Sequence, residues 1–204
     1  NHILSAQNPQ QFLKLILTIG TIRALLETTV ESSKRAASVI QNIKSSLSVT
    51  KGQKKEKIDL RQNISSVIKL FRHEIESIAK LEVSLEEDIY IHGVDFKLFQ
   101  LWTNIIKNAI YAIKEKKANR KIIINSITKN DFAVVSIINN GPKIPADVQN
   151  KIFDKFYTTK EKKGSGLGLG IVKSVIESHQ ASIILKSTQK ETMFEFSFKL
   201  NNKR

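Results

Sequence analysis

The most informative stretch of the sequence is Gly164-Ser165-Gly166-Leu167-Gly168-Leu169-Gly170-Ile171. Four glycines stand here, at the start of an apolar run that predicts a helix over residues 167–178. Glycine lets backbone N–H groups come close to an anion, and the N-terminus of a helix adds a favourable partial charge. The stretch has neither the Gly-Lys-Ser/Thr of a P-loop nor the place in a βαβ unit that a dinucleotide fingerprint requires. It therefore predicts a phosphate-binding loop of another type.

A rigid turn precedes the glycines and follows a predicted strand. The turn is Asn139-Asn140-Gly141-Pro142-Lys143-Ile144-Pro145, and the strand covers residues 132–139. One glycine and two prolines restrict its backbone, so the turn can hold a polar side chain against a ligand. Taken alone it is an ordinary strand exit.

A third segment, Asn104-Ile-Ile-Lys-Asn-Ala-Ile-Tyr-Ala, lies on a helix predicted over residues 95–117. Asn104, Lys107 and Asn108 are spaced three and four residues apart, so they share one face. An amide oxygen can bind Mg²⁺ while a lysine meets a phosphate oxygen, and this face therefore suits a metal-bound triphosphate. The alternative is that the three residues are simply the solvated side of the helix.

Together these segments resemble the N, G1 and G2 boxes of the histidine-kinase branch of the GHKL ATPases, a superfamily that also holds gyrase B, Hsp90 and MutL. Between the turn and the glycines lies Ile152-Phe-Asp-Lys-Phe-Tyr-Thr-Thr-Lys, which resembles the F box of the same family. The family form of that box ends in Phe-Thr-Thr-Lys. The resemblance extends from about residue 57 to residue 200.

The resemblance implies a role for each matching residue. Asn108 is expected to hold Mg²⁺, and residues 145–163 are expected to form a mobile lid over ATP, anchored to the core by Phe153 and Phe156. Lys160, with Lys162 and Lys163 as further candidates, is expected to screen the phosphates. The residues expected to bind the nucleotide are Asn104, Lys107, Asn108, Asn140, Gly141, Lys160, Gly164, Gly166, Leu167 and Gly168.

The turn departs from the family pattern Asp-x-Gly-x-Gly, whose Asp accepts a hydrogen bond from the adenine amino group. Asn140 is assigned to that place here, and Lys143 replaces the second glycine. A neutral asparagine oxygen still accepts but forfeits a charge-assisted bond, which predicts ATP binding weakened about tenfold. Lys143 either clashes with the base or supplies new charge.

The phosphoacceptor of the family is a histidine followed by an acidic residue and then by Asn/Thr-Pro. None of the four histidines fits this pattern. His73-Glu74 comes nearest, but it falls within a predicted helix over residues 60–79 and no proline follows. No catalytic residue is therefore assigned, and the acceptor either lies upstream of Asn1 or is absent.

Residues 57–204 predict one domain of alternating elements. Helices grouped with antiparallel hairpins favour an α+β fold, a two-layer sandwich with one layer of each, and the resemblance makes it the Bergerat-type ATP-binding fold. Strands are predicted at residues 57–59, 81–85, 89–92, 121–128, 132–139, 182–187 and 192–200, and helices at residues 60–79, 95–117 and 167–178.

The first fifty residues predict one long helix that starts at Asn8-Pro9. Apolar residues recur three and four apart from Phe12 through Ile19 to Leu47, and no glycine or proline marks a turn near residues 28–33, so one helix is favoured over a hairpin. Such a helix is about 60 Å long, too long to bury its stripe against one small domain. The stripe is therefore expected to meet another helix, from a second copy of the chain or from an upstream part of the protein. We expect a homodimer through this coiled-coil stripe, with residues 51–56 as a linker; packing along its own domain is the alternative.

The end of this helix, residues 32–45, also resembles the second helix of the dimerization and phosphotransfer hairpin of histidine kinases. That hairpin forms a four-helix bundle in the family's dimers. The resemblance therefore supports the same expectation of a dimer.

The composition sets wider limits. The absence of cysteine excludes disulfides and thiolate chemistry and favours the reducing cytoplasm. No apolar run is long enough to span a membrane, but the start at Asn1 suggests a fragment of a longer protein whose upstream part could include membrane spans. The net charge of +14 comes from short lysine clusters rather than from one basic element, so solvated surfaces rather than nucleic-acid binding are expected.

These observations lead to one main hypothesis and two alternatives. The main hypothesis is the histidine-kinase module of a two-component signalling system, which binds Mg-ATP and transfers the γ-phosphoryl group to a histidine outside this sequence. The first alternative is a degenerate kinase with weak or no ATP binding that acts as a dimeric scaffold or phosphotransfer partner for a response-regulator receiver domain. The second is a GHKL ATPase with a conformational role, which the F-box segment and the long helix disfavour.

Overall fold

The computed structural model describes residues 9–47, 54–116, 118–160 and 166–201. The chain divides into two compact units, residues 1–50 and residues 51–204, and each is described here by itself. Within the described residues, no helix is long and apolar enough to cross a lipid bilayer.

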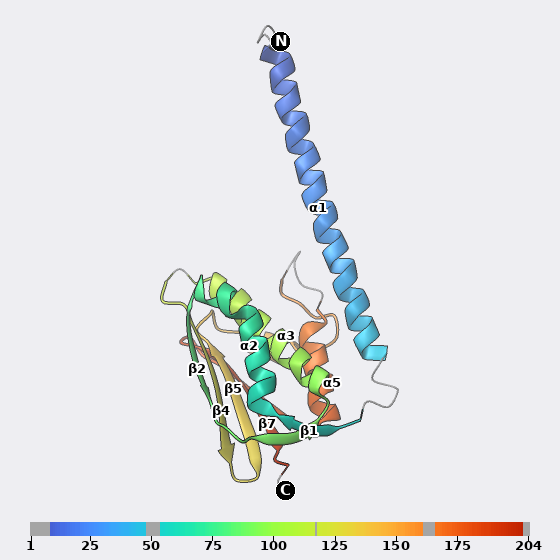
Figure 1. Ribbon diagram of the computed structural model, residues 1–204. Coiled ribbons are helices and arrows are strands. Elements are labelled where there is room, and N and C mark those ends of the chain that lie inside the picture. Colours follow the sequence, from blue (N-terminus) through green and yellow to red (C-terminus); the bar gives the residue numbers. More distant parts are fainter. Residues whose placement is uncertain (1–8, 48–53, 117, 161–165, 202–204) are drawn as a thin grey trace. The chain divides into compact units, whose positions relative to one another are not determined.

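The first unit is one unbroken helix, α1 (Pro9–Leu47), of 39 residues (Figure 1). The single helix is as predicted, although its predicted end near Gly52 lies outside the described residues. Between residues 12 and 29, where side chains are described, the apolar side chains of α1 are open to solvent: Phe12 is 66% exposed, Ile19 57% and Leu26 61%.

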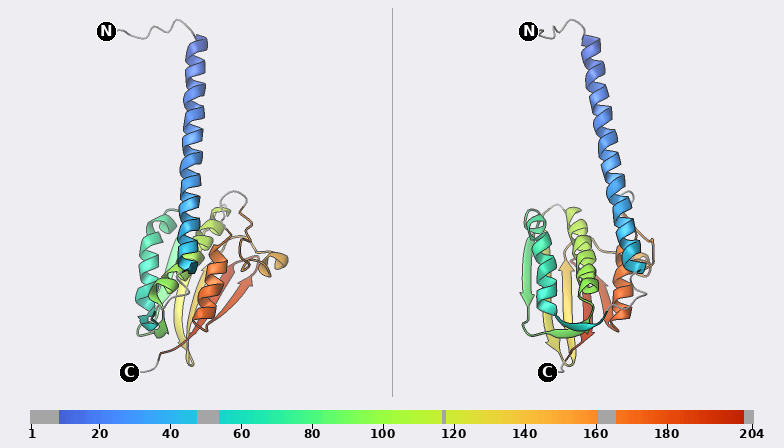
Figure 2. Two further views of the ribbon diagram at one scale, coloured as in Figure 1. Left: turned by 90° about the vertical axis from the view of Figure 1, so that its right-hand side faces the viewer. Right: turned by 45° about the vertical axis from the view of Figure 1, so that its right-hand side comes forward.

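The second unit is a two-layer sandwich of the predicted α+β type. One layer is a five-stranded sheet in the order β2-β4-β5-β7-β6, and helices α2, α3 and α5 cover one of its faces (Figures 1 and 2). β1 and β3 form a separate two-stranded antiparallel sheet. The elements are β1 (Glu56–Asp59), α2 (Leu60–Glu76), β2 (Lys80–Leu85), β3 (Tyr90–Gly93), α3 (Asp95–Lys114), β4 (Lys121–Lys129), β5 (Phe132–Asn139), α4 (Ala146–Gln149), α5 (Gly168–Ser178), β6 (Ser182–Ser187) and β7 (Thr192–Lys199).

Every predicted strand and helix of this unit is present, with ends displaced by no more than a few residues. Two details differ from the prediction. The sheet is mixed, because β2 runs parallel to β4 while its other strand pairs are antiparallel. The chain between β2 and β4 passes through β3 and α3, and a helical crossover of this kind returns the chain in the same direction. The short helix α4 also falls in a stretch predicted to be irregular.

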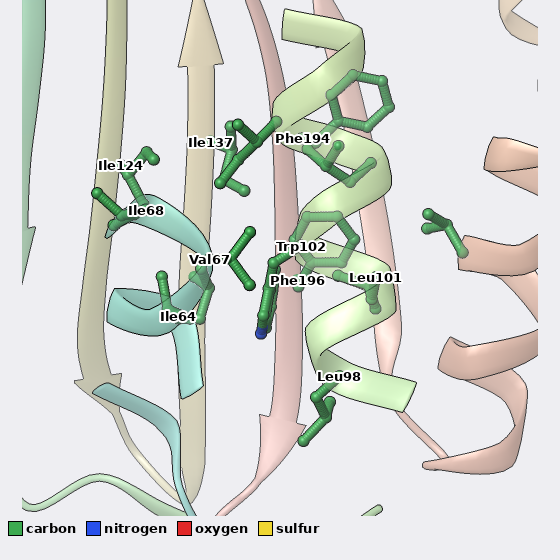
Figure 3. Packing of buried hydrophobic residues seen from close by; sticks show 14 of the residues in the cluster. Ile64, Val67, Ile68, Leu98, Leu101, Trp102, Ile124, Ile137, Phe194 and Phe196 are labelled. Atoms are coloured by element: carbon green, nitrogen blue, oxygen red, sulfur yellow. The ribbon is translucent and has the colours of Figure 1, made fainter. Parts of the chain in front are cut away.

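The core lies between the helices and the sheet and is centred on Trp102 of α3, which has no exposed surface (Figure 3). Its ring meets Phe196 of β7 edge to face, with the ring centroids 5.3 Å apart, and Phe198 at 5.9 Å. Such aromatic pairs add about 0.5–1.5 kcal/mol each beyond the area they bury. Ile64 and Ile68, one turn apart on α2, complete the helical side. The packing fixes α3 firmly, and α3 is the helix on which the candidate site is built.

His179 closes α5 and joins it to the turn before α3. The backbone N–H of Val94 donates to its Nε2 at 3.0 Å, so the ring proton is on Nδ1, which donates to the Val175 carbonyl at 2.8 Å. A Cβ on Gly93 would lie 2.8 Å from two atoms of the ring. Burial lowers the pKa of His179, and the hydrogen bond to Val175 opposes that shift.

This burial predicts that the second unit loses stability in acid. The pKa of His179 is lower in the folded than in the unfolded protein, so the unfolded chain binds more protons as the pH falls through about 6.5. Thermal unfolding followed at pH 7.5 and pH 5.0 should give a lower melting temperature at pH 5.0. The drop should shrink in His179→Gln but persist in His73→Gln, which changes an exposed histidine of α2. Equal drops in both variants would contradict the assignment.

Candidate functional site

One face of α3 carries both asparagines of the first motif. The amide nitrogen of Asn104 donates to the Gln100 carbonyl at 2.9 Å, which orients the side chain. The start of α5 lies against it, because a Cβ on Gly168 would come within 3.2 Å of the Asn104 Oδ1. The start of α5 and the asparagine-bearing face of α3 thus meet at Gly168 and Asn104, which are 64 residues apart in the sequence.

One helical turn further along α3, Lys160, from the segment predicted to form a lid, reaches the predicted metal ligand Asn108. Lys160 Nζ donates to Asn108 Oδ1 at 2.8 Å and lies 4.3 Å from the centroid of the Tyr111 ring. Burial lowers the pKa of Lys160, while the nearby charge of Glu115 opposes the shift. A cation therefore already sits on the amide oxygen that was expected to bind one.

One helical turn beyond Asn108, α3 meets the loop that follows β5. A Cβ on Gly141 would lie 2.9 Å from the backbone carbon and oxygen of Ala112, so only glycine lets the two backbones approach so closely. Three of the predicted segments therefore converge on successive turns of α3, at Asn104, Asn108 and Ala112.

Asn140, in contrast, does not offer its side chain to this face. Its Oδ1 accepts from the Lys121 N–H at 2.8 Å, and its Nδ2 donates to the Asn119 carbonyl at 2.6 Å. Both ends of the amide are used to hold the turn to the start of β4. The sequence-based assignment of Asn140 to the adenine position is not supported by this geometry.

Asn139 is the better candidate for that position. It ends β5, is 3% exposed, and alternates with the buried Val135 and Ile137 on the face that the helices cover. Its Nδ2 is buried and has no hydrogen-bond partner among the described residues. Counting could have found it, because the Asp of Asp-x-Gly-x-Gly stands two residues before the first glycine, which is Gly141.

Two lysines lie away from the converging segments. Lys107 Nζ is 5.8 Å from the centroid of the Phe71 ring on α2, so its ammonium points along the other side of α3 from Lys160. Lys143, in the place of the second glycine of the turn, is exposed. The structure thus brings Asn104, Asn108 and Lys160 together and leaves Lys107 apart.

The glycine stretch is described from Gly166 onward, and Gly164, Lys162 and Lys163 lie outside the described residues. Gly166 has a φ of +66°, and a Cβ there would lie 2.3 Å from the Phe156 carbonyl carbon. Its carbonyl accepts from the Phe156 N–H at 2.9 Å. Leu167, half-buried, occupies the N-cap of α5, and Gly168 begins the helix.

Of the two phenylalanines that were expected to anchor the predicted lid to the core, Phe153 packs against the core and Phe156 does not. Phe153 is partly buried against the core, whereas Phe156 is 72% exposed. Phe156 has a φ of +68°, which reverses the chain where it meets Gly166. The next residue, Tyr157, packs against the core instead.

The domain is a two-layer sandwich in which the asparagine-bearing face of α3 lies against the glycine-rich start of α5. These features define a nucleotide-binding domain of the GHKL class. Comparison with known proteins gives the family directly. Residues 93–202 match the family described as histidine kinase-, DNA gyrase B-, and HSP90-like ATPase. The chain belongs to this family.

Individual relatives are sensor kinases. Sporulation kinase A of Bacillus subtilis is 37% identical over 152 residues, 71% of this chain and 24% of that protein. The sensor histidine kinase FlgS of Helicobacter pylori is 29% identical over 209 residues, 96% of this chain and 52% of that protein. The solved structure of histidine kinase ThkA in complex with response regulator protein TrrA has a TM-score of 0.64 at 26% identity, covering 96% of this chain and 53% of that one. The chain spans only about a quarter to a half of the length of these curated relatives.

Proposed function

We propose that this chain is the kinase module of a two-component signalling system. Residues 1–50 form the dimerization helix, residues 51–56 a linker, and residues 57–204 a catalytic domain that acts in the cytoplasm. The domain binds Mg-ATP and passes the γ-phosphoryl group to a histidine outside this sequence. The partner is the receiver domain of a response regulator, which the solved complex of ThkA with TrrA supports.

The observation that carries this proposal is the contact between Lys160 and Asn108. The two residues are 52 positions apart, and the lid lysine nevertheless places its ammonium 2.8 Å from the amide oxygen. A lid over a nucleotide has to deliver a positive charge to this point of α3. Phosphoryl transfer depends mainly on such positioning and charge neutralisation.

Asn108 is the residue that would hold Mg²⁺. Its oxygen fits a cation, since it already accepts a hydrogen bond from one. Mg²⁺ takes few protein ligands and completes its shell with phosphates and water, so a single amide is sufficient. When bound, the metal would neutralise and orient the phosphates.

The remaining residues bind and screen the phosphates. Lys160 exchanges its hydrogen bond with Asn108 for one with a phosphate oxygen when the nucleotide enters. The backbone N–H groups at Gly166, Leu167 and Gly168 lie at the start of the 11-residue helix α5, whose partial positive charge favours the anion. Gly141 holds the turn beside α3, and Asn139 replaces Asn140 at the base.

Calorimetric titration with Mg-ATP tests the proposal. The native chain should show saturable binding that is lost when EDTA removes Mg²⁺. If no heat develops with or without Mg²⁺, the kinase proposal falls. The scaffold alternative, which the uncharged Asn139 at the base position favours, would then take its place.

The dimer is a further part of the proposal, and it predicts the effect of charges on α1. Phe12, Ile19 and Leu26 follow one stripe of the helix, and each is more than half exposed within its unit. Ile19→Glu should therefore convert the dimer into a monomer, measured by sedimentation equilibrium. Leu17 is 64% exposed on the opposite side of α1, so Leu17→Glu is the matched control and should remain a dimer. A monomeric native chain would contradict the prediction.

A further inference from the structure

Tyr111 extends the face of α3 that carries the candidate site. It lies three residues after Asn108, which itself lies four residues after Asn104, so the three side chains follow one another along the helix. Tyr111 is half-buried, and the Nζ atom of Lys160 lies 4.3 Å from the centroid of its ring. This tyrosine was not expected to take part in nucleotide binding. Its ring nevertheless meets the lysine that reaches Asn108.

The ammonium of Lys160 has little to compensate its charge, although the residue is half-buried. Among the described residues, it meets one neutral oxygen, Asn108 Oδ1 at 2.8 Å, and one aromatic face, that of Tyr111. Glu115 is near enough for its charge to act on Lys160, but these two described residues form no ion pair. An aromatic face attracts a cation through its negative quadrupole, and the attraction is stronger where water is excluded. The ring of Tyr111 therefore stabilises the ammonium in place of a carboxylate.

The contact uses the ring of Tyr111 and not its hydroxyl group. The hydroxyl makes no hydrogen bond within the described part of the chain, whereas the ammonium lies over the ring. The backbone of Lys160 is held separately, because its N–H donates to Thr158 Oγ1 at 3.1 Å. Phenylalanine in place of Tyr111 should therefore keep the contact, and an aliphatic residue should lose it.

The two contacts of Lys160 respond differently when a metal-bound nucleotide enters. Asn108 Oδ1 is the expected ligand of Mg²⁺, and an ammonium on the same oxygen would be repelled by the metal. Lys160 therefore gives up this hydrogen bond. The ring of Tyr111 does not compete for Mg²⁺, which prefers oxygen ligands, so the second contact persists. Tyr111 is then the group that keeps the ammonium beside α3 while its hydrogen bond passes from the amide to a phosphate oxygen.

We propose that the ring of Tyr111 positions the ammonium of Lys160 for the phosphates of the bound nucleotide. The proposal rests on the proposed function, since it concerns the nucleotide bound along α3. Tyr111 acts through Lys160 and is a positioning residue, not a catalytic one. The observation that carries the proposal is that one ammonium lies 4.3 Å from the ring centroid and 2.8 Å from Asn108 Oδ1 at the same time.

A double-mutant cycle between Tyr111 and Lys160 tests the proposal. Mg-ATP is titrated by calorimetry into the native chain, Tyr111→Leu, Lys160→Met and the double variant. Tyr111→Leu should weaken binding about tenfold, and Lys160→Met should weaken it by at least as much. In the Lys160→Met background, Tyr111→Leu should cause no further loss, because the ring then has no ammonium to position. Tyr111→Phe, which keeps the ring, should bind within about twofold of the native chain.

Tyr90→Leu is the matched control. Tyr90 lies on β3, and Lys57 Nζ lies 4.4 Å from the centroid of its ring, so this variant breaks a similar contact away from α3. It should leave the affinity for Mg-ATP unchanged.

A second readout needs no nucleotide. In NMR spectra of the nucleotide-free chain, the ring current of Tyr111 should shift the ε-methylene protons of Lys160 upfield. This shift should remain in Tyr111→Phe and Tyr90→Leu and disappear in Tyr111→Leu.

Each outcome decides a separate point. If Tyr111→Leu binds Mg-ATP as the native chain does, or weakens it equally with and without Lys160, the proposal is overturned and the proposed function stands. A native chain in which the Lys160 protons are not shifted also overturns it. If the native chain binds no Mg-ATP, the proposed function fails and the proposal fails with it. Should Tyr111→Leu not fold, Tyr111→Phe decides: weakened binding or a lost shift in that variant overturns the proposal.

Discussion

Asn108→Ala is expected to lower the affinity for Mg-ATP by about a hundredfold or more. The substitution removes the amide oxygen that would bind the metal, the same oxygen that now accepts from Lys160 at 2.8 Å. A contact to a charged group is worth about 1.5–3 kcal/mol, and the upper part of that range corresponds to a hundredfold in affinity. Calorimetric titration with Mg-ATP measures the change.

The control for this variant is Asn125→Ala. Asn125 lies on β4, where the buried residues Ile124 and Ser126 alternate with it, so it faces away from the helices. Its removal should leave the affinity for Mg-ATP unchanged. Thermal unfolding should show that both variants remain folded, because both side chains are only half-buried. Native affinity in Asn108→Ala would mean that the site is not on this face of α3.

Gly141→Ala is expected to have the second large effect, on the fold and on nucleotide binding together. The new Cβ would lie 2.9 Å from the backbone of Ala112, and no flexible side chain is there to move aside. Overpacking of this kind costs about 1–3 kcal/mol of unfolding free energy. The turn would also shift away from α3 and carry Asn139 with it, so Mg-ATP affinity should fall as well. Urea unfolding and calorimetry measure the two effects.

Gly170→Ala is the matched control, since it adds the same methyl group to another glycine near the site. Its Cβ would meet Lys155 Cγ at 3.5 Å, an ordinary contact at a flexible side chain. Alanine also favours the helix by about 1 kcal/mol over glycine, so this variant should be as stable as the native chain or slightly more so. Equal stability of Gly141→Ala and Gly170→Ala would contradict the close approach of the turn to α3.

The spacing of residue types within each segment was sufficient to predict the helices, the strands and much of the candidate site. Asn104 and Asn108 share a helical face by spacing alone, and glycines before an apolar run predict the start of α5. The structure places both on a common face of the domain because Trp102 fixes α3 against the sheet. The meeting of the two segments was expected only through the resemblance to a family, since spacing within a segment carries no information about distant contacts.

Features that depend on contacts between distant segments could not be predicted from the spacing within one segment. Lys107 is three residues from Asn104 and one from Asn108, but it leans toward Phe71 because α2 offers an aromatic face there. The parallel pairing of β2 with β4 depends on where α3 returns the chain, which no local pattern states. Phe156 was expected to anchor the lid to the core because of the F-box resemblance, but its side chain is 72% exposed and its φ is +68°.

The assignment of Asn140 was a different kind of error. Two adjacent asparagines precede Gly141, and only the alternation along β5 shows which one faces the helices. Asn139 continues the buried series of Val135 and Ile137, whereas Asn140 has already left the strand. The choice between Asn139 and Asn140 therefore required the register of β5. The sequence suggests this register, and the pairing of β5 with β4 and β7 fixes it.

The hydrogen bond from the Phe156 N–H to the Gly166 carbonyl joins two points that are ten residues apart in the sequence. The entropy of closing a loop grows only with the logarithm of its length, at about 0.6 kcal/mol for each doubling. Residues can therefore be inserted or deleted between these two points at little cost to the rest of the domain. The number of residues between Phe156 and Gly166 can therefore change in evolution without moving α5, which begins at Gly168.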